Sequence, residues 1–411
     1  MKKLTKFMFF LSFLFSVASL SSVAYFGNRI ADSYYVSGNE ALSFEGLPVQ
    51  CSQGNNDITV NSKNNTSVSG LKTRVSLFGI IPIKTVSVTE IKSTEVAVLG
   101  TPFGLKIYTK GVLVVGFSDV ETENGTENPA KNCGIKVGDT ILSVDGKAVT
   151  SNSAMQSLVS KLKGKSCELR VKRNEKEFDV TLKPVLSKSD KTYKIGLWIR
   201  DSSAGIGTLT FYSPELKVLA GLGHGICDAD IGELVPFERG ELVNAEIVGV
   251  KKATDKTTGE LQGVFSSGTI AELRDNDITG VYGSTSQLAG CDNNMKLALK
   301  QEVEVGKAQI LTTLDEEGPK VYNCKIEKVY HNDSSKIKNM VVKITDEELL
   351  KKTGGIVQGM SGSPIIQDGK LIGAVTHVFV NDPQKGYAIF AENMLETAQG
   401  IAQEQQMKDA S

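Results

Sequence analysis

Glycine divides this chain into short apolar runs, and this pattern most limits what the chain can fold into. The sequence has 40 glycines in 411 residues, or about 10%, compared with about 7% in an average protein. Runs rich in Val and Ile, such as 243–250, 321–329 and 341–344, recur from about 190 to 400 between turn residues. Several short strands over such a length suit two packed β-barrels or a sandwich. Here only 391 to about 407 is predicted to be helical.

The first 28 residues have the pattern of a membrane segment. Lys2, Lys3 and Lys6 precede an uncharged stretch from Phe7 to Asn28. Its length fits one span of about 20 residues, and the lysines predict that the remainder is exported. Small residues at 22–24 also fit a signal-peptide cleavage site. Residues 1–28 are therefore either a retained anchor or a signal segment, and both place the body outside the cytoplasm.

Charge and cysteine content exclude some functions. Lys and Arg total 46 and Asp and Glu 47, a formal net charge of -1, so no basic surplus indicates nucleic acid. The six cysteines form no C-x-x-C pair, and export permits disulfides without revealing their pairing. Buried free thiols are an equally good interpretation. Zinc-ligand spacing is missing from the sequence, so no metal and no cofactor are expected.

Residues 29–96 are predicted to form a tether followed by strands. The polar run 61–67 favours a flexible segment, and 75–83 and 86–88 are strand-like. Pro82 within that pattern indicates an edge strand or a bulge.

The run 130–149, AKNCGIKVGDTILSVDGKAV, resembles the PDZ modules of bacterial proteases. We therefore expect a PDZ domain at 97–185. Asp145-Gly146 predicts a tight turn, and Ser151 is suited to cap a helix. PDZ domains bind an extended peptide by strand addition. The resemblance places the ligand loop at Phe103, Gly104 and Leu105.

The run 359–364, GMSGSP, has the residues that an acyl-transfer site needs. Flanking glycines can hold Ser361 on a tight turn and leave backbone N–H groups free for a substrate oxyanion. A base must activate the serine, and histidine titrates in the right range. His224, in Gly-His-Gly after an apolar run, is the favoured base. His377 is a weaker candidate, His331 is interpreted as a turn residue, and Ser363 is the rival nucleophile.

The chain resembles the SpoIVB peptidases of endospore-forming bacteria, which are PDZ-containing serine proteases of the chymotrypsin-like clan. The resemblance is carried by 77–86, 110–116, 200–210, 222–226 and 354–366. It implies a mostly β protein with a chymotrypsin-like double β-barrel at 190–411. It also implies Ser361 as nucleophile, His224 as base and Asp346 as third member, with the amides of Gly359 and Ser361 as oxyanion hole. Asp346 precedes the serine by 361 − 346 = 15 residues, so rivals for contacting His224 remain open: Asp228, Asp230, Asp275 and Asp277.

The resemblance further implies a role and a place in the cell. Such enzymes are secreted into the space between the two forespore membranes, cleave themselves, and clip the extracellular part of a membrane regulator. That cut releases an intramembrane metalloprotease, which activates the late mother-cell sigma factor. Self-cleavage is expected between the anchor and the PDZ domain, where polar chain is accessible. A non-catalytic PDZ adaptor and a broad quality-control protease of the cell envelope are the alternatives.

Overall fold

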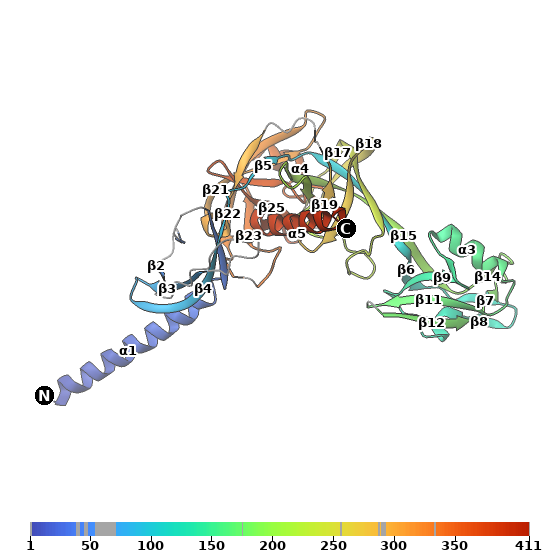
Figure 1. Cartoon of the computed structure of the whole chain (residues 1–411), viewed down its shortest axis with the longest axis horizontal. Helices are drawn as coiled ribbons and strands as arrows, with labels where there is room; N and C mark the ends of the chain where they lie inside the picture. The colour runs from blue at the N-terminus through green and yellow to red at the C-terminus, as the bar shows by residue number, and fades with distance from the viewer. Residues whose placement is uncertain are drawn as a thin grey trace.

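The computed structural model shows three parts in a row (Figure 1). Helix α1 (Lys2–Gly27) projects from one end, a body of β-barrels lies in the middle, and the PDZ domain lies at the other end. The structure describes residues 2–37, 42–44, 48–53, 71–174, 176–254, 257–286, 288, 293–332 and 334–410. Within α1, Lys6–Gly27 is long and apolar enough to cross a membrane and is not buried in the protein. This is compatible with either an anchor or a signal segment.

A four-stranded sheet follows the helix. Its order is β1 (Ser33–Ser37), β4 (Ile81–Ile91), β3 (Leu71–Leu77) and β2 (Val49–Gln53), with β1 parallel to β4. Tyr34, Val75 and Val86 form part of its buried core. Pro82 pairs with Ser76 at a bulge in β4, as its residue type predicted. The tether prediction for 61–67 lies outside the described residues, but the strands around it make a folded subdomain.

Six strands close the first barrel. They are β6 (Pro102–Phe117), β15 (Leu197–Ser213), β16 (Val218–Gly221), β19 (Gly280–Ser284), β18 (Glu260–Asp277) and β17 (Arg239–Lys251), and each pairs with the next until β17 returns to β6. Their inward side chains, among them Phe103, Ile107, Leu219 and Leu242, are almost fully buried.

A second ring of six strands closes in the same way. It runs β21 (Gly306–Thr313), β22 (Pro319–Val329), β23 (Met340–Ile344), β26 (Asp382–Phe390), β25 (Lys370–Phe379) and β24 (Pro364–Gln367), which pairs with β21. The rings are bridged by β5 (Glu95–Val98) and β20 (Asn294–Leu297). Helix α5 (Ala391–Asp409) packs over the bridge, and η1 (Lys300–Glu302) and α4 (Glu347–Thr353) complete this part. The predicted double barrel and C-terminal helix are thus confirmed.

The PDZ domain is inserted between β6 and β15. It contains α2 (Pro129–Asn132), β9 (Thr140–Val144), β10 (Lys147–Ala148), α3 (Asn152–Lys161), β11 (Cys167–Arg173) and β12 (Lys176–Leu182), with the ribbons β7 (Val120–Thr122)–β8 (Gly125–Glu127) and β13 (Val185–Leu186)–β14 (Tyr193–Lys194). Asp145 and Gly146 have φ of 47° and 71°, as a tight hairpin turn requires. The Ser151 hydroxyl accepts from the Ala154 amide at 3.1 Å, so the expected helix cap is present. The turn expected at 174–175 is described only at Asn174.

The insertion corrects two predictions. β6 and β15 each begin in one domain and end in the other, so residues 102–108 belong to the first barrel and the PDZ domain begins after them (Figure 1). The predicted boundary at 97 is therefore too early. Phe103, Gly104 and Leu105 pair with β15 on one side and β17 on the other. A strand paired on both edges has no free edge for a peptide, so the prediction of a ligand loop there is wrong.

Candidate functional site

The Ser361 turn follows α4 and leads into β24. Gly359 and Gly362 have φ of 94° and 91°, a backbone region that favours glycine. Two threonines of β15 bind the backbone of this turn. Thr208 Oγ1 donates to the Gly359 carbonyl at 2.8 Å, and Thr210 Oγ1 donates to the Gly362 carbonyl at 2.7 Å. The Thr208 amide also donates to the Ser361 carbonyl at 2.9 Å. The first barrel thus fixes the shape of a turn that belongs to the second.

Two backbone amides of this turn are left without an acceptor. Met360 and Gly362 donate to the carbonyls of Val357 and Val375, whereas the amides of Gly359 and Ser361 donate no hydrogen bond to any described residue. Unpaired amides are rare in folded proteins and mark places where an external acceptor can bind. One of these amides belongs to Ser361 itself and the other to Gly359, and these are the two donors that the resemblance implied for an oxyanion hole.

His224 lies three residues beyond the end of β16, as its apolar flank predicted. Its Nδ1 lies 2.9 Å from the Gly225 carbonyl oxygen. Because a carbonyl can only accept, Nδ1 carries the proton and Nε2 keeps its lone pair, which is the tautomer of a general base. Burial lowers the pKa of His224 below its usual value, with the Gly225 carbonyl acting in the opposite direction. The ring is therefore neutral and ready to accept a proton at neutral pH.

The serine and histidine segments are brought together at the junction of the two barrels. A Cβ added to Gly362 would overlap the backbone of Leu222, two residues before His224. The Ser361 hydroxyl donates to the Thr376 carbonyl at 2.9 Å. No hydrogen bond joins it to His224 in the described residues.

His377 is the other member of this cluster. Its ring centroid lies 4.8 Å from that of His224, with 38° between the planes. Partial desolvation, followed by His224 and Lys338, lowers the pKa of His377 to about 4. His331 lies elsewhere, stacked 6.3 Å from the Phe390 ring, and burial lowers its pKa to about 4. The sequence interpreted His331 as a turn residue, and the structure places it two residues beyond the end of β22, packed against Phe390.

The rival nucleophile is excluded by its surroundings. Ser363 is fully buried, and its hydroxyl donates to the hydroxyl of Thr312 in β21 at 3.0 Å. Its role is therefore to join the serine turn to β21.

Asp346 is placed away from His224. Its carboxylate caps α4 by accepting from the amides of Glu348 and Leu349, and it also accepts from the Asn323 amide at 3.1 Å. Among the described residues no hydrogen bond or ion pair joins it to His224. Val341 and His377 both pair with Tyr387, whereas Asp346 lies five residues further along the chain from Val341, beyond the end of β23. The structure therefore does not bring Asp346, the third triad member that the resemblance implied, into contact with His224.

Three of the four other aspartates contact groups other than His224. Asp228 and Asp230 bind Arg200, and Asp277 accepts from the amide and hydroxyl of Thr279. Burial raises the pKa of Asp275. In the described structure the group that holds His224 Nδ1 is the Gly225 carbonyl.

The groove of the PDZ domain is not at residues 103–105, where the sequence predicted the ligand loop. A groove of about 610 Å³ lies between α3 and the first residues of β15, with Met155 and Val159 on one wall and Leu197 and Ile199 on the other. Residues 197–199 pair only with β6, so their other edge is open towards α3. Ile195 and Gly196, with Gly196 at φ 81°, link β14 to β15 beside the groove. The hydrophobic-Gly-hydrophobic pattern Ile195-Gly196-Leu197 was the signal that could have located it.

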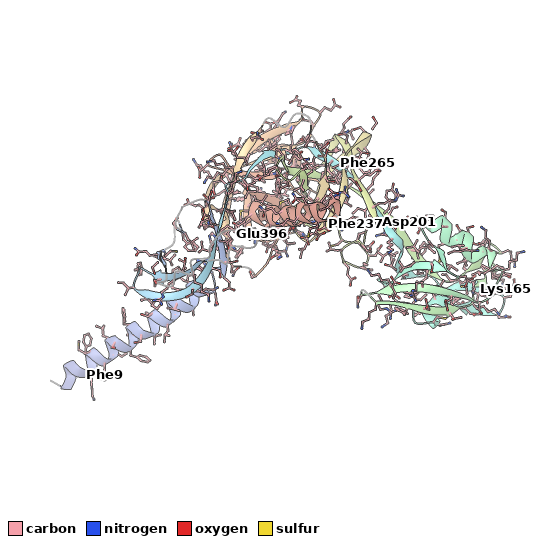
Figure 2. The ribbon with its side chains drawn as sticks, viewed as in Figure 1. Phe9, Lys165, Asp201, Phe237, Phe265 and Glu396 are labelled. Atoms are coloured by element: carbon pink, nitrogen blue, oxygen red, sulfur yellow. The ribbon has the colours of Figure 1, made fainter. Side chains whose placement is uncertain are left out.

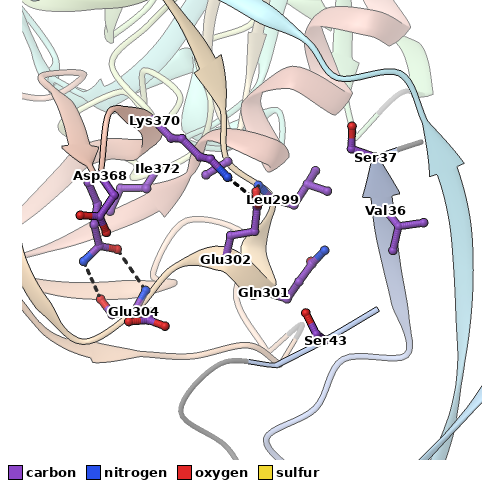
Figure 3. A pocket seen from close by; sticks show the side chains of 12 residues that line it. Val36, Ser37, Ser43, Leu299, Gln301, Glu302, Glu304, Asp368, Lys370 and Ile372 are labelled. Atoms are coloured by element: carbon purple, nitrogen blue, oxygen red, sulfur yellow. Dashed lines mark hydrogen bonds and ion pairs between the residues drawn. The ribbon is translucent and has the colours of Figure 1, made fainter. Parts of the chain in front are cut away.

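A second cavity marks where the N-terminal sheet meets the second barrel (Figure 3). It has a volume of about 320 Å³ and is lined by β1, η1 and the β24–β25 hairpin. Lys370 and Glu302 form an ion pair across it at 2.7 Å, and the Gln301 side-chain amide donates to the Tyr35 carbonyl at 2.7 Å. Since Ser361 and His224 are not among its lining residues, this cavity belongs to the subdomain interface.

Comparison with known proteins identifies the barrels. Residues 191–395 match the model of the SpoIVB peptidase family S55, and residues 109–183 match the PDZ domain. The chain belongs to the SpoIVB peptidase family. It is accordingly a serine peptidase. The family match begins within the approach to β15, so the first barrel also needs β6, which lies before the inserted PDZ domain.

Solved structures give weaker likenesses. The HtrA-type protease AlgW with a tripeptide has a TM-score of 0.32 and 16% identity over 49% of this chain, and the chain spans 57% of AlgW. The Rv3671c protease from M. tuberculosis, active form, has a TM-score of 0.28 and 11% identity over 48% of this chain and 74% of its own. The PDZ domain of the SdrC-like protein from Listeria monocytogenes has a TM-score of 0.19 and 21% identity over 23% of this chain and 90% of its own. None of the curated proteins matches significantly.

Proposed function

We propose that this peptidase is a membrane-associated regulatory serine endopeptidase of sporulation. It would cleave itself and the extracellular part of a membrane regulator, and so trigger intramembrane activation of the late mother-cell sigma factor. The observation that supports the catalytic half of this proposal is the Ser361 turn. Its Gly359 and Ser361 amides donate to no described residue, and its Gly362 packs against Leu222, two residues before His224. The membrane half is supported by the exposed apolar helix α1. The site of action would be the space between the forespore membranes.

In this proposal Ser361 Oγ attacks the peptide carbonyl. His224 Nε2 takes its proton and later returns it to the leaving amine, and the Gly225 carbonyl keeps the ring in the required tautomer. The amides of Gly359 and Ser361 receive the negative oxygen of the tetrahedral intermediate. Each such donor contributes about a hundredfold to a thousandfold in rate.

The PDZ groove supports a regulated rather than a broad protease. Its open edge at 197–199 can accept an extended peptide by strand addition, and the same strand continues to Thr208 below the serine turn. The regulator's own extracellular peptide or the chain's own termini are the ligands that the proposal requires. A broad quality-control enzyme would not need a single strand that both forms the edge of the PDZ groove and supports the serine turn.

The test uses the full chain in detergent micelles, as wild type, Ser361→Ala and Ser363→Ala. We expect a fluorophosphonate probe to label wild type and Ser363→Ala, and discrete self-cleavage products to appear in the same two proteins. Failure of wild type to react in either assay would contradict the catalytic assignment and favour the adaptor alternative. Strong degradation of casein by wild type would favour the quality-control alternative.

The proposed signalling role in sporulation is tested in a spore-forming host. We expect Ser361→Ala to abolish the late mother-cell sigma reporter while the variant accumulates to the normal level. A normal reporter in that strain would refute the signalling role and leave the peptidase assignment intact.

A further inference from the structure

The loop that follows His224 contains a buried negative charge. Asp228 has a side chain with no exposure to solvent. Its Oδ1 accepts from the Asp230 amide at 2.9 Å, and its backbone amide donates to the Glu233 carbonyl at 2.8 Å. Asp228 is thus the residue around which the loop between His224 and β17 is folded.

Both ends of this loop are fixed by another buried residue. The Asn276 side chain accepts from the Ile226 amide at 2.7 Å and donates to the carbonyls of Ile226 and Val235. Ile226 and Val235 also bond to each other across the loop neck. The segment between them folds around Asp228, and its neck begins two residues after His224.

The positive charge that balances Asp228 comes from a different part of the molecule. Arg200, on β15, directs Nη1 to Asp228 and Nη2 to Asp230, the latter at 2.6 Å. Among the described residues Arg200 alone forms an ion pair with Asp228. A buried carboxylate that loses its only cation is strongly destabilised, so the loop would have to rearrange to reach water.

Arg200 occupies a particular place on β15. Residues 197–199, just before it, form the open edge of the PDZ groove. Asp201, just after it, accepts from the Asn152 amide at 2.8 Å, at the start of the groove helix α3. Figure 2 marks Asp201 on the two-stranded connection between the barrels and the PDZ domain. The same strand then reaches Thr208 beneath the serine turn.

We propose that Arg200 is a positioning residue for the peptidase. It holds the loop behind His224 through Asp228, and it does so from the strand that forms the PDZ ligand edge. This inference rests on the proposed catalytic role of His224. It makes the position of the general base depend on where β15 lies, so the PDZ domain and the catalytic histidine share one structural connection.

The kinetic test uses the full chain in micelles and a fluorophosphonate ester as probe. Arg200→Gln should lower the maximal labelling rate of Ser361 about tenfold or more and change the half-saturating concentration less than about twofold, since His224 activates Ser361 without binding the probe. Adding Asp228→Asn should restore most of that rate, because a neutral amide needs no cation. The matched control, Arg170→Gln, removes two exposed ion pairs of the PDZ domain and should behave as wild type.

A second readout is independent of catalysis. In a Ser361→Ala background, amide hydrogen exchange between Gly225 and Glu238 should be faster in Arg200→Gln and return towards the parent value in Arg200→Gln/Asp228→Asn. Wild-type labelling and exchange in Arg200→Gln would overturn the proposal. A failure of the double variant to recover would overturn it as well, because the buried charge would then not be the cause. If the unmodified chain takes up no probe, the proposed function fails, while the exchange experiment still tests the loop.

Discussion

The α carbon of Gly362 lies against the backbone of Leu222, and this contact joins the serine turn of one barrel to the histidine segment of the other. A Cβ at Gly362 would overlap Leu222 and the Thr208 carbonyl. The segments that carry Ser361 and His224 can therefore approach closely because residue 362 has no side chain. Their relative position depends on close packing between barrels, with no hydrogen bond between Ser361 and His224 in the described state.

Gly362→Ala should therefore move Ser361 away from His224, the pair to which we assign catalysis. The methyl group cannot be accommodated without moving Leu222 or Thr208, and φ of 91° adds strain. We expect kcat/KM to fall by about a hundredfold or more and the unfolding temperature to fall by several degrees. Gly369→Ala is the control, because Gly369 has φ of 75° but no neighbour within 4 Å of the added methyl. Equal losses in the two variants would show that backbone strain alone, and not the barrel contact, is responsible.

The pH dependence should distinguish the two neighbouring histidines. His224 must be neutral to act as a base, and burial lowers its pKa, so the acid limb of kcat/KM should fall below the ordinary histidine value of about 6.5. His224→Gln should abolish activity. His377→Gln should keep activity within about tenfold of wild type, because Ser361 bonds to the backbone of Thr376 and not to the His377 ring. Complete inactivity of His377→Gln would instead make His377 the base.

Asp346 offers a direct test of its two roles. Asparagine caps a helix about as well as aspartate, whereas alanine loses about 1 kcal/mol. The observed cap geometry predicts that Asp346→Asn leaves the free energy of unfolding unchanged and changes kcat by less than about threefold. It also predicts that Asp346→Ala lowers the free energy of unfolding. Denaturant unfolding and probe labelling measure these effects. A loss of more than a hundredfold in Asp346→Asn would show that the carboxylate reaches His224 during catalysis.

Acid should weaken the fold through His331. Its pKa is about 4 in the folded chain and about 6.5 when unfolded, so below pH 6.5 the unfolded chain binds a proton that the folded chain refuses. Stability contributed by the neutral ring is complete above pH 6.5 and is lost as the pH falls towards 4. We expect about 1–2 kcal/mol of loss between pH 7 and 5, and a flatter pH dependence in His331→Gln. Parallel curves for the two proteins would contradict a buried neutral His331.

Local sequence features predicted the local parts of this structure well. The turn at Asp145-Gly146, the Ser151 cap, the bulge at Pro82 and the strand before His224 all follow from short-range backbone preferences. Ser361 could be recognised because two glycines are needed around it for a turn with free amides. In each case the residues that cause the feature lie within a few positions of it.

Features that depend on pairing between strands far apart in the sequence could not be predicted in the same way. Phe103 pairs with Gly207 and Asn244, and nothing near Phe103 in the sequence reveals strands more than a hundred residues away. The insertion of the PDZ domain into a barrel, and with it the true groove at 193–199, was missed for this reason. Asp346 was implied by the family resemblance alone, but its carboxylate caps α4 and accepts hydrogen bonds from the amides of Glu348 and Leu349.

The N-terminal sheet has a consequence for any cut made between β2 and β3. Such a cut would leave β1 and β2 on the fragment with α1, and β3 and β4 on the fragment with the peptidase. Both the β1–β4 and the β2–β3 pairings would still join the two pieces, as would the bond from Gln301 to the Tyr35 carbonyl. Breaking the chain and releasing the enzyme from its membrane helix are therefore separate events. The nicked protein would behave as a two-chain complex that stays tethered until the small sheet unfolds.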